Sequence, residues 1–127
     1  MPATTDRYEI AVARYFEAWN AREPENLACA VTTAWTPLGG YTDPLADVRG
    51  HEGIVAVVAA AQARFPGFVF RLTGPVDGHH DTARFSWELV SEADGSAPVA
   101  GSDVITLDAD GRIESVLGFL DRVPAEA

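Results

Sequence analysis

One carboxylate of the sequence falls on the apolar side of a predicted strand. Asp103 lies within Val99–Leu107 and shares alternate positions with Gly101, Ile105 and Leu107, so the strand would carry its side chain into the interior. A buried carboxyl without a partner either costs several kcal/mol or has its pKa raised until it stays protonated, and a protonated acid can donate a hydrogen bond to a developing oxyanion. The alternative is an aspartate at the edge or end of a strand in contact with water, and the alternation does not separate the two.

Tyr15 and Asp43 are the other polar residues that could belong to such a site. Tyr15 lies on the apolar stripe of the first predicted helix, where a phenol could equally be a core residue with its hydroxyl bonded to the backbone. Asp43 precedes Pro44 at the end of a short predicted strand, a place that turn chemistry explains without any function. The hypothesis is that Tyr15, Asp43 and Asp103 converge on one pocket as its catalytic residues.

Aromatic side chains could line the rest of that pocket. The candidates for contact with a flat or polycyclic ligand are Trp19, Phe85, Trp87, Phe119 and, as an imidazole, His80. Core packing uses the same aromatic residues and is the expected role of at least half of them. The sequence therefore predicts a hydrophobic ligand without fixing which of these side chains touch it.

Several motifs are missing from the sequence, and this narrows the chemistry. It contains no HExxH, CxxC or spaced histidine pair, and adjacent residues of His79–Asp81 would point to opposite faces of a strand, so we predict no metal. It also contains no GxGxxG, GxxxxGK(S/T) or GxSxG motif, so the usual sequence motifs of nucleotide-binding proteins and serine hydrolases are missing. We expect a site without a cofactor. The single cysteine, Cys29, is predicted to be a small buried side chain on a helix.

The charge balance argues against polyanionic partners. A net charge of −10 results from 19 acidic residues against nine arginines and no lysine, so the chain lacks the positive field that nucleic acid or anionic lipid requires. The first residues show no basic region followed by an apolar run, and no stretch approaches the roughly 20 apolar residues of a membrane span. We therefore expect a cytoplasmic protein that binds neither nucleic acid nor a membrane.

Helical periodicity comes first along the chain, and strand alternation comes second. Apolar spacing predicts three helices, at about residues 6–20, from Pro24, and between Gly50 and Pro66. Alternation predicts four strands, at about 68–73, 81–90, 99–107 and 112–120. Residues 35–44 are predicted as an irregular loop that ends in a brief strand. The fold class is α+β, with three N-terminal helices packed on an antiparallel sheet, as one domain over residues 1–127.

The order of these features resembles the NTF2-like superfamily, above all its SnoaL-like polyketide cyclase and ketosteroid isomerase branches, over nearly the whole chain. Ala13-Arg14-Tyr15 is similar to the segment with the isomerases' oxyanion-hole tyrosine, and Tyr41-Thr42-Asp43-Pro44 to the segment that ends in their general-base Asp-Pro. Asp103, before the turn at Gly111-Arg112-Ile113, resembles in placement their second oxyanion-hole acid. The same strand position resembles that of the single acid/base aspartate in SnoaL-type cyclases.

The resemblance implies a cone in which helices cup a curved sheet around a pocket for a small hydrophobic carbonyl compound. There Asp43 would move a proton between carbons while Tyr15 and Asp103 stabilise the enolate, in an isomerisation or an aldol-type cyclisation without a cofactor. The alternative is a non-catalytic small-ligand-binding or protein-interaction module of the same fold. Val31 and Val58 depart from the isomerases, which carry further tyrosines near those places. A homodimer is also implied, and the predicted polar outer face of the sheet is compatible with it.

Overall fold

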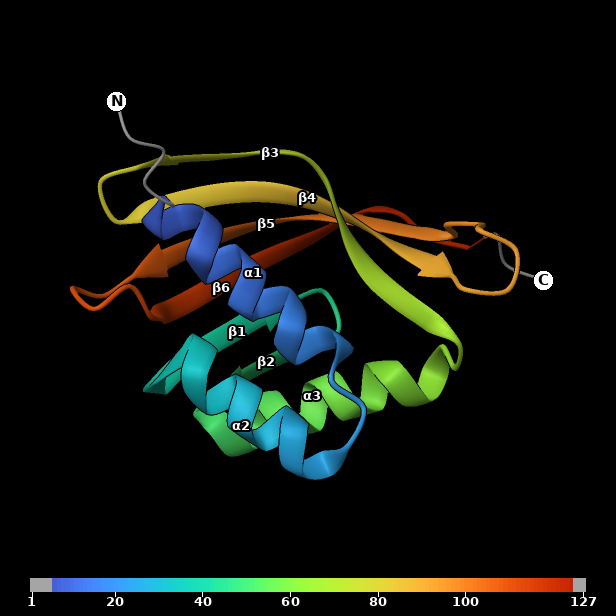
Figure 1. The fold of residues 1–127 in the computed structure, drawn as a ribbon, viewed down its shortest axis with the longest axis horizontal. Helices are drawn as coiled ribbons and strands as arrows, with labels where there is room; N and C mark the ends of the chain where they lie inside the picture. Colours follow the sequence, from blue (N-terminus) through green and yellow to red (C-terminus); the bar gives the residue numbers. More distant parts are fainter. Residues whose placement is uncertain (1–5, 125–127) are drawn as a thin grey trace.

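Three helices lie on one side of a six-stranded sheet in the computed structural model, which describes residues 6–124 (Figure 1). The helices are α1 (Arg7–Asn20), α2 (Pro24–Ala34) and α3 (His51–Arg64). The strands are β1 (Trp35–Asp43), β2 (Ala46–Arg49), β3 (Phe68–His79), β4 (Thr82–Ser91), β5 (Val99–Leu107) and β6 (Ile113–Arg122). They are arranged in the order β2-β1-β6-β5-β4-β3. The predicted α+β class and the three N-terminal helices are confirmed.

The ends of the helices have local causes in the sequence. Asp6 caps α1, because its carboxylate accepts the backbone N–H of Tyr8 at 2.7 Å. α2 begins at Pro24, whose fixed φ suits the first helical turn. Gly50 precedes α3 with a φ of 92°, which a residue with a Cβ rarely adopts. The first of these helices, α1, supplies three residues to the cavity described below.

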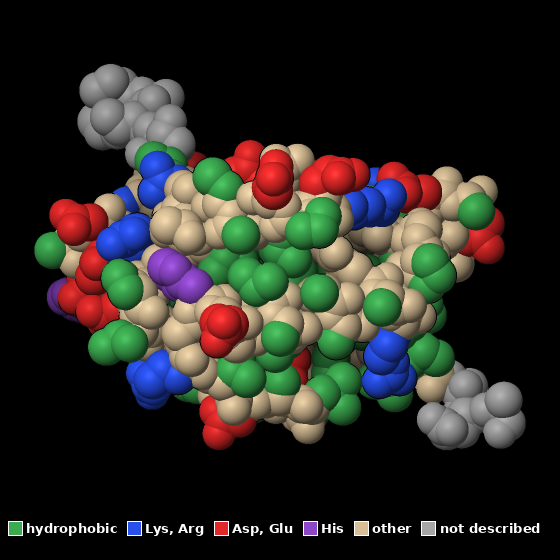
Figure 2. Space-filling view, turned by 90° about the horizontal axis from the view of Figure 1, so that it is seen from below, with side chains coloured by type: hydrophobic (Ala, Val, Ile, Leu, Met, Phe, Trp, Pro, Cys, Tyr) green, Lys and Arg blue, Asp and Glu red, His purple; other side chains and the backbone are tan. Residues whose placement is uncertain are grey.

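The side of the helices that faces away from the sheet is rich in apolar residues. Figure 2, seen from below, shows hydrophobic side chains across the middle of this face and charged ones mainly around its edge. Cys29 of α2 is exposed, contrary to the prediction, because the buried stripe of that helix consists of Leu27, Val31 and Ala34 and Cys29 lies on the other side. None of the helices within residues 6–124 is long and apolar enough to cross a membrane.

The sheet is mixed, not antiparallel as predicted, because the segment interpreted as a loop forms a full strand. β1 pairs parallel with β6 and antiparallel with β2, a strand that the sequence patterns did not indicate. The register with β6 shifts between Trp35 and Gly40, and Pro37 is exposed within this irregular part, where the ladder does not need its missing N–H. The parallel pairing brings the end of β1, and with it Asp43, beside β6.

β3 also extends beyond its predicted end at Gly74-Pro75. The ladder with β4 is interrupted between Thr73 and Asp77 and then resumes, because Gly74 adopts a φ of 76° and Pro75 lacks an N–H. Arg84 of β4 forms an ion pair with Asp77 across the resumed ladder, with 3.2 Å between Nε and Oδ2.

Aromatic residues fill the space between α1 and the sheet. The ring of Tyr15 lies 5.3 Å from that of Phe85, 5.5 Å from that of Trp35 and 6.0 Å from that of Trp19, measured between centroids. Tyr15 is only 3% exposed. The polar tip of this phenol is therefore held by packing on several sides, which fixes the direction of its hydroxyl.

Candidate functional site

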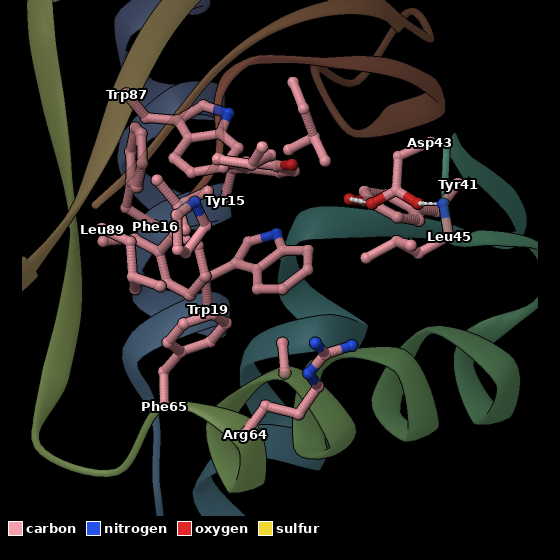
Figure 3. A pocket seen from close by; sticks show the side chains of 16 residues that line it. Tyr15, Phe16, Trp19, Tyr41, Asp43, Leu45, Arg64, Phe65, Trp87 and Leu89 are labelled. Carbon is pink, nitrogen blue, oxygen red and sulfur yellow. Dashed lines mark hydrogen bonds between the residues drawn. The ribbon is translucent and has the colours of Figure 1, made fainter. Parts of the chain in front are cut away.

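A cavity of about 560 Å³ lies between the helices and the sheet, a size typical of small-molecule sites. Its wall is mainly aromatic and aliphatic, and Trp19 and Trp87 both contribute to it (Figure 3). Oxygen atoms reach the wall from three side chains, those of Tyr15, Tyr41 and Asp43. The cavity thus combines an apolar volume with a small group of polar atoms, as expected of a site for a hydrophobic ligand with one polar function.

Tyr15 and Asp103 form a buried pair. The Tyr15 hydroxyl donates a hydrogen bond of 2.6 Å to Oδ2 of Asp103, which is 2% exposed. Tyr15 is part of the cavity wall, whereas Asp103 stands behind it. The hypothesis that the two residues meet is correct, but only Tyr15 reaches the cavity, and Asp103 is separated from it by the phenol.

The burial of Asp103 changes its acidity. Loss of solvation raises the pKa of its carboxyl from 3.8 to about 6, a rise that the polar contacts of Tyr15 and Trp87 oppose and the charges of Asp43 and Asp121 assist. Burial, and then the neighbouring Asp103, also raise the pKa of the Tyr15 hydroxyl well above 10.0. Near neutral pH the negative charge of the pair is therefore on Asp103. Lowering the pH to about 6 protonates half of the Asp103 carboxyls.

Tyr41 and Asp43 form a second pair, which lies beside the first at the same end of the cavity (Figure 3). The Tyr41 hydroxyl donates to Oδ2 of Asp43 at 2.5 Å, while Oδ1 accepts the backbone N–H groups of Leu45 and Ala46, each at 2.8 Å. Burial, and then the hydrogen bond to Asp43, raise the pKa of the Tyr41 hydroxyl far above its usual value. Asp43 is thus a turn residue, as its position before proline suggested, and also a residue of the cavity wall.

A glycine lets the two carboxylates lie close together. Asp103 of β5 is directly opposite Gly118 of β6, and the end of β1 lies on the other side of β6. A methyl group added at Gly118 would lie 2.7 Å from Oδ1 of Asp103 and 3.3 Å from Cβ of Asp43. Three residues on adjacent strands thus lie side by side, in the order Asp43, Gly118 and Asp103. Only a glycine fits at the middle position.

A second glycine, Gly101, leaves space for the indole ring of Trp87. A Cβ on Gly101 would overlap the indole ring of Trp87, which lies directly opposite on β4. The indole consequently rests against the backbone of β5, two residues from Asp103. Neither Gly101 nor Gly118 was among the site residues predicted from the sequence, because glycine in a strand gives no sign of which partner approaches it.

The predicted ligand-binding residues do not all reach the cavity. Trp19 and Trp87 line it, but Phe85 is a core residue behind Tyr15. Phe119 is 59% exposed, because it alternates with buried Gly118 along β6 and so points to the outer face of the sheet. His80 lies in the turn between β3 and β4 with a φ of 49°, where its carbonyl accepts the Tyr8 hydroxyl at 2.8 Å. The structure therefore does not bring Phe85, Phe119 or His80 to the cavity wall.

Tyr41 is the functional candidate that the sequence analysis missed. Its signal was the spacing of two residues to Asp43, because residues i and i+2 of a strand share a face. Val31 and Val58, which stand near the places of the isomerases' further tyrosines, are fully buried core residues. Within residues 6–124 no group of three or more His, Cys, Asp or Glu side chains is placed to hold a metal ion.

Comparison with known proteins identifies the family of this chain. Residues 12–116 match the SnoaL-like domain family. The structure of a candidate isomerase of the SnoaL-like family from Agrobacterium tumefaciens is 41% identical in sequence, and the match covers 91% of this chain and 97% of that chain with a TM-score of 0.85. A search of curated proteins found no match.

More distant structures share the fold alone. One is a candidate SnoaL-like polyketide cyclase from Jannaschia, with 21% identity, coverage of 95% of this chain and 91% of that chain, and a TM-score of 0.74. Another is an NTF2-like protein of unknown function from Cytophaga hutchinsonii, with 13% identity, coverage of 95% of both chains and a TM-score of 0.64. The curved sheet and its three helices are an NTF2-like fold, and the chain belongs to the SnoaL-like family.

Proposed function

We propose that this protein binds a small hydrophobic carbonyl compound and catalyses proton transfer beside its carbonyl group without a cofactor. The observation that carries the proposal is the arrangement at one end of an apolar cavity, where the Asp43 carboxylate faces the buried Tyr15–Asp103 pair. The candidate isomerase from Agrobacterium tumefaciens, at 41% identity, supports the same class of reaction. Isomerisation of a double bond and aldol-type cyclisation are the two reactions that fit.

In this mechanism Asp43 removes a proton from the carbon next to the carbonyl group. The electrons of the broken C–H bond form the C=C bond of an enolate, whose negative charge is on the oxygen. In an isomerisation Asp43 then returns the proton to a second carbon; in a cyclisation the enolate carbon bonds to a second carbonyl carbon, and that oxygen takes the proton. Positioned general bases contribute about 10²–10⁴-fold, and oriented donors to the oxyanion add to this.

The Tyr15–Asp103 pair would stabilise the enolate oxygen. While Asp103 is ionised, the Tyr15 hydroxyl proton is engaged by it. Once Asp103 takes up a proton, it can donate to the phenol oxygen, and the Tyr15 hydroxyl can turn its own proton into the cavity. A negative oxygen beside Tyr15 favours this proton uptake, because it raises the affinity of the pair for a proton.

Asp43→Asn is expected to lower turnover by at least about 100-fold, because the amide cannot accept the proton. The assay follows the absorbance of the conjugated product from a β,γ-unsaturated ketosteroid, and the loss of polyketide-like poly-β-ketones by mass spectrometry. Asp47→Asn is the matched control, since Asp47 is an exposed carboxylate on the neighbouring strand β2. Unchanged turnover in both Asp43→Asn and Asp103→Asn would sink the proposal.

The second candidate function is ligand binding without catalysis. It is favoured by one observation: the Asp43 carboxylate already accepts three hydrogen bonds, which limits its capacity to take a proton from a ligand. A ligand recovered as an adduct in native mass spectrometry that leaves the protein chemically unchanged, with equal affinity for wild type and Asp43→Asn, would select this function.

We also propose that the protein forms a homodimer through the outer face of the sheet. Leu117 and Phe119 of β6 are 49% and 59% exposed on that face, which is a feature of surfaces that associate. Light scattering is expected to give twice the chain mass of 13.6 kDa, and Phe119→Asp to shift the protein towards monomer. A wild type that is only monomeric at all concentrations would contradict the proposal.

A further inference from the structure

Two tryptophans of the described chain bury a hydrogen-bond donor without a partner. These are Nε1 of Trp19 and Nε1 of Trp35. Trp19 is 6% exposed and lines the cavity, whereas Trp35 is fully buried and is not part of the cavity wall. Buried donors are nearly always paired in folded proteins, because leaving one unpaired costs free energy. Trp19, unlike Trp35, borders the cavity, while its Nε1 atom itself exposes less than 1 Å² of surface.

The direction of the Trp19 N–H follows from its neighbours. Figure 3 shows the indole nitrogen on the edge of the ring that faces Tyr15. The N–H lies close enough to the Tyr15 hydroxyl to oppose the rise in the pKa of that group, but it makes no hydrogen bond with it. The indole is also held in place, with its ring 4.9 Å from that of Phe70 and 5.5 Å from that of Tyr41. An acceptor oxygen beside Tyr15 would therefore reach this N–H once the side chains that cover Nε1, which exposes less than 1 Å², move slightly apart.

The two phenol donors at this end of the cavity are engaged. Tyr15 donates to Asp103 and Tyr41 donates to Asp43, while the Trp87 indole lies close enough to Asp103 to oppose the rise in the pKa of that carboxyl. With Asp103 ionised, the phenols therefore present acceptors to a ligand, and a carbonyl oxygen is itself only an acceptor. Arg64, the other side-chain donor of the wall, is an exposed residue at the end of α3.

We propose that the indole N–H of Trp19 donates the hydrogen bond that holds the ligand's carbonyl oxygen, next to the Tyr15 hydroxyl. The inference rests on the proposed binding of a carbonyl compound and specifies how the oxygen is recognised. Because an indole N–H does not titrate, this contact persists at pH values where the Tyr15–Asp103 pair cannot donate. The ligand's apolar part would then lie along the aromatic wall that includes Phe70 and Trp87.

The test follows the three indole N–H signals of ¹⁵N-labelled protein by NMR during titration with 2-acetylnaphthalene. The matched ligand is 2-ethylnaphthalene, which has a similar shape without the acceptor oxygen. The Trp19 signal is expected to move downfield with the ketone and much less with the hydrocarbon, and the Trp35 signal to stay in place with both. Spectra of Trp19→Phe and Trp35→Phe assign the signals, so the result is obtained on wild-type protein.

The affinities of the same ligands provide a second measurement. Trp19→Phe is expected to weaken ketone binding about 5- to 10-fold, at pH 5 and pH 8 alike, and to change hydrocarbon binding less than about twofold. A structural role alone would weaken both ligands equally and overturn the inference. Binding of the ketone without movement of the Trp19 signal would also overturn the inference, but it would leave the proposed function intact. Movement of the Trp19 signal in a protein that shows no turnover would contradict only the catalytic part of the proposed function. Failure of both ligands to bind would refute both.

Discussion

Replacement of Asp103 by asparagine is expected to stabilise the fold progressively as the pH rises from about 4 to 7. Burial raises the pKa of this carboxyl from 3.8 to about 6, so between these values the folded protein binds a proton that the unfolded chain has released. The stability that Asp103 contributes is therefore present below about pH 3.8 and is lost as the pH rises through about 6. At 1.36 kcal/mol per pH unit, ionised Asp103 lowers the free energy of unfolding by about 3 kcal/mol.

The measurement is the free energy of urea unfolding for wild type and Asp103→Asn at several pH values. Asparagine accepts the Tyr15 hydroxyl more weakly than a carboxylate does, and this loss offsets part of the gain at high pH. The quantity that tests the prediction is therefore the change with pH of the difference in unfolding free energy between Asp103→Asn and wild type. Asp110→Asn, an exposed turn aspartate, is the control and should show no such slope. A difference between wild type and Asp103→Asn that does not change with pH would contradict a buried, ionisable Asp103.

The same variant separates two roles for Asp103 in catalysis. If the pair donates to the enolate oxygen, kcat/KM of the wild type decreases above about pH 6, because Asp103 then lacks the proton that frees the Tyr15 hydroxyl. Asp103→Asn, whose amide can donate to Tyr15 at every pH, should lose this decrease. A wild-type kcat/KM that increases through pH 6 would instead assign Asp103 as the base, acting through Tyr15.

The position of Asp103 was accessible from the sequence, whereas that of Asp43 relative to it was not. β5 is paired on both sides and its burial alternates strictly, so the period of two places Asp103 inside with Gly101 and Ile105. Asp43 reaches the same site only because β1 pairs parallel with β6, across Pro37 and an irregular register. Such a long-range pairing leaves no local pattern, and the local signals favoured a loop.

The roles of the two glycines at the site could not be predicted from the sequence either. Gly101 and Gly118 are ordinary strand glycines until the partners that approach them, Trp87 and Asp103, are known. Phe119 illustrates the opposite failure. Its type suggested a pocket residue, but its place after Gly118 on β6 decided that it points outward. Residue type predicted what chemistry was available, and strand register determined which residues meet.

Gly118→Ala is expected to lower turnover by about 100-fold and the free energy of unfolding by about 1–3 kcal/mol. The added methyl group would lie 2.7 Å from Oδ1 of Asp103, closer than carbon and oxygen pack. β6 is held by ladders on both sides, so the Asp103 side chain must move. Its 2.6 Å hydrogen bond from Tyr15 is then lost, and a buried carboxyl is left without its donor.

Gly40→Ala is the matched control, because the added methyl on this β1 glycine would come no closer than 3.8 Å to any atom. A thermodynamic cycle with Asp103→Ala identifies the clash. Removing the carboxyl leaves room for the methyl group, so Gly118→Ala should cost far less stability in the Asp103→Ala background than in wild type. If the cost is the same in both backgrounds, the methyl group clashes with Asp43, whose Cβ would be 3.3 Å away, and Gly118 does not position the Tyr15–Asp103 pair.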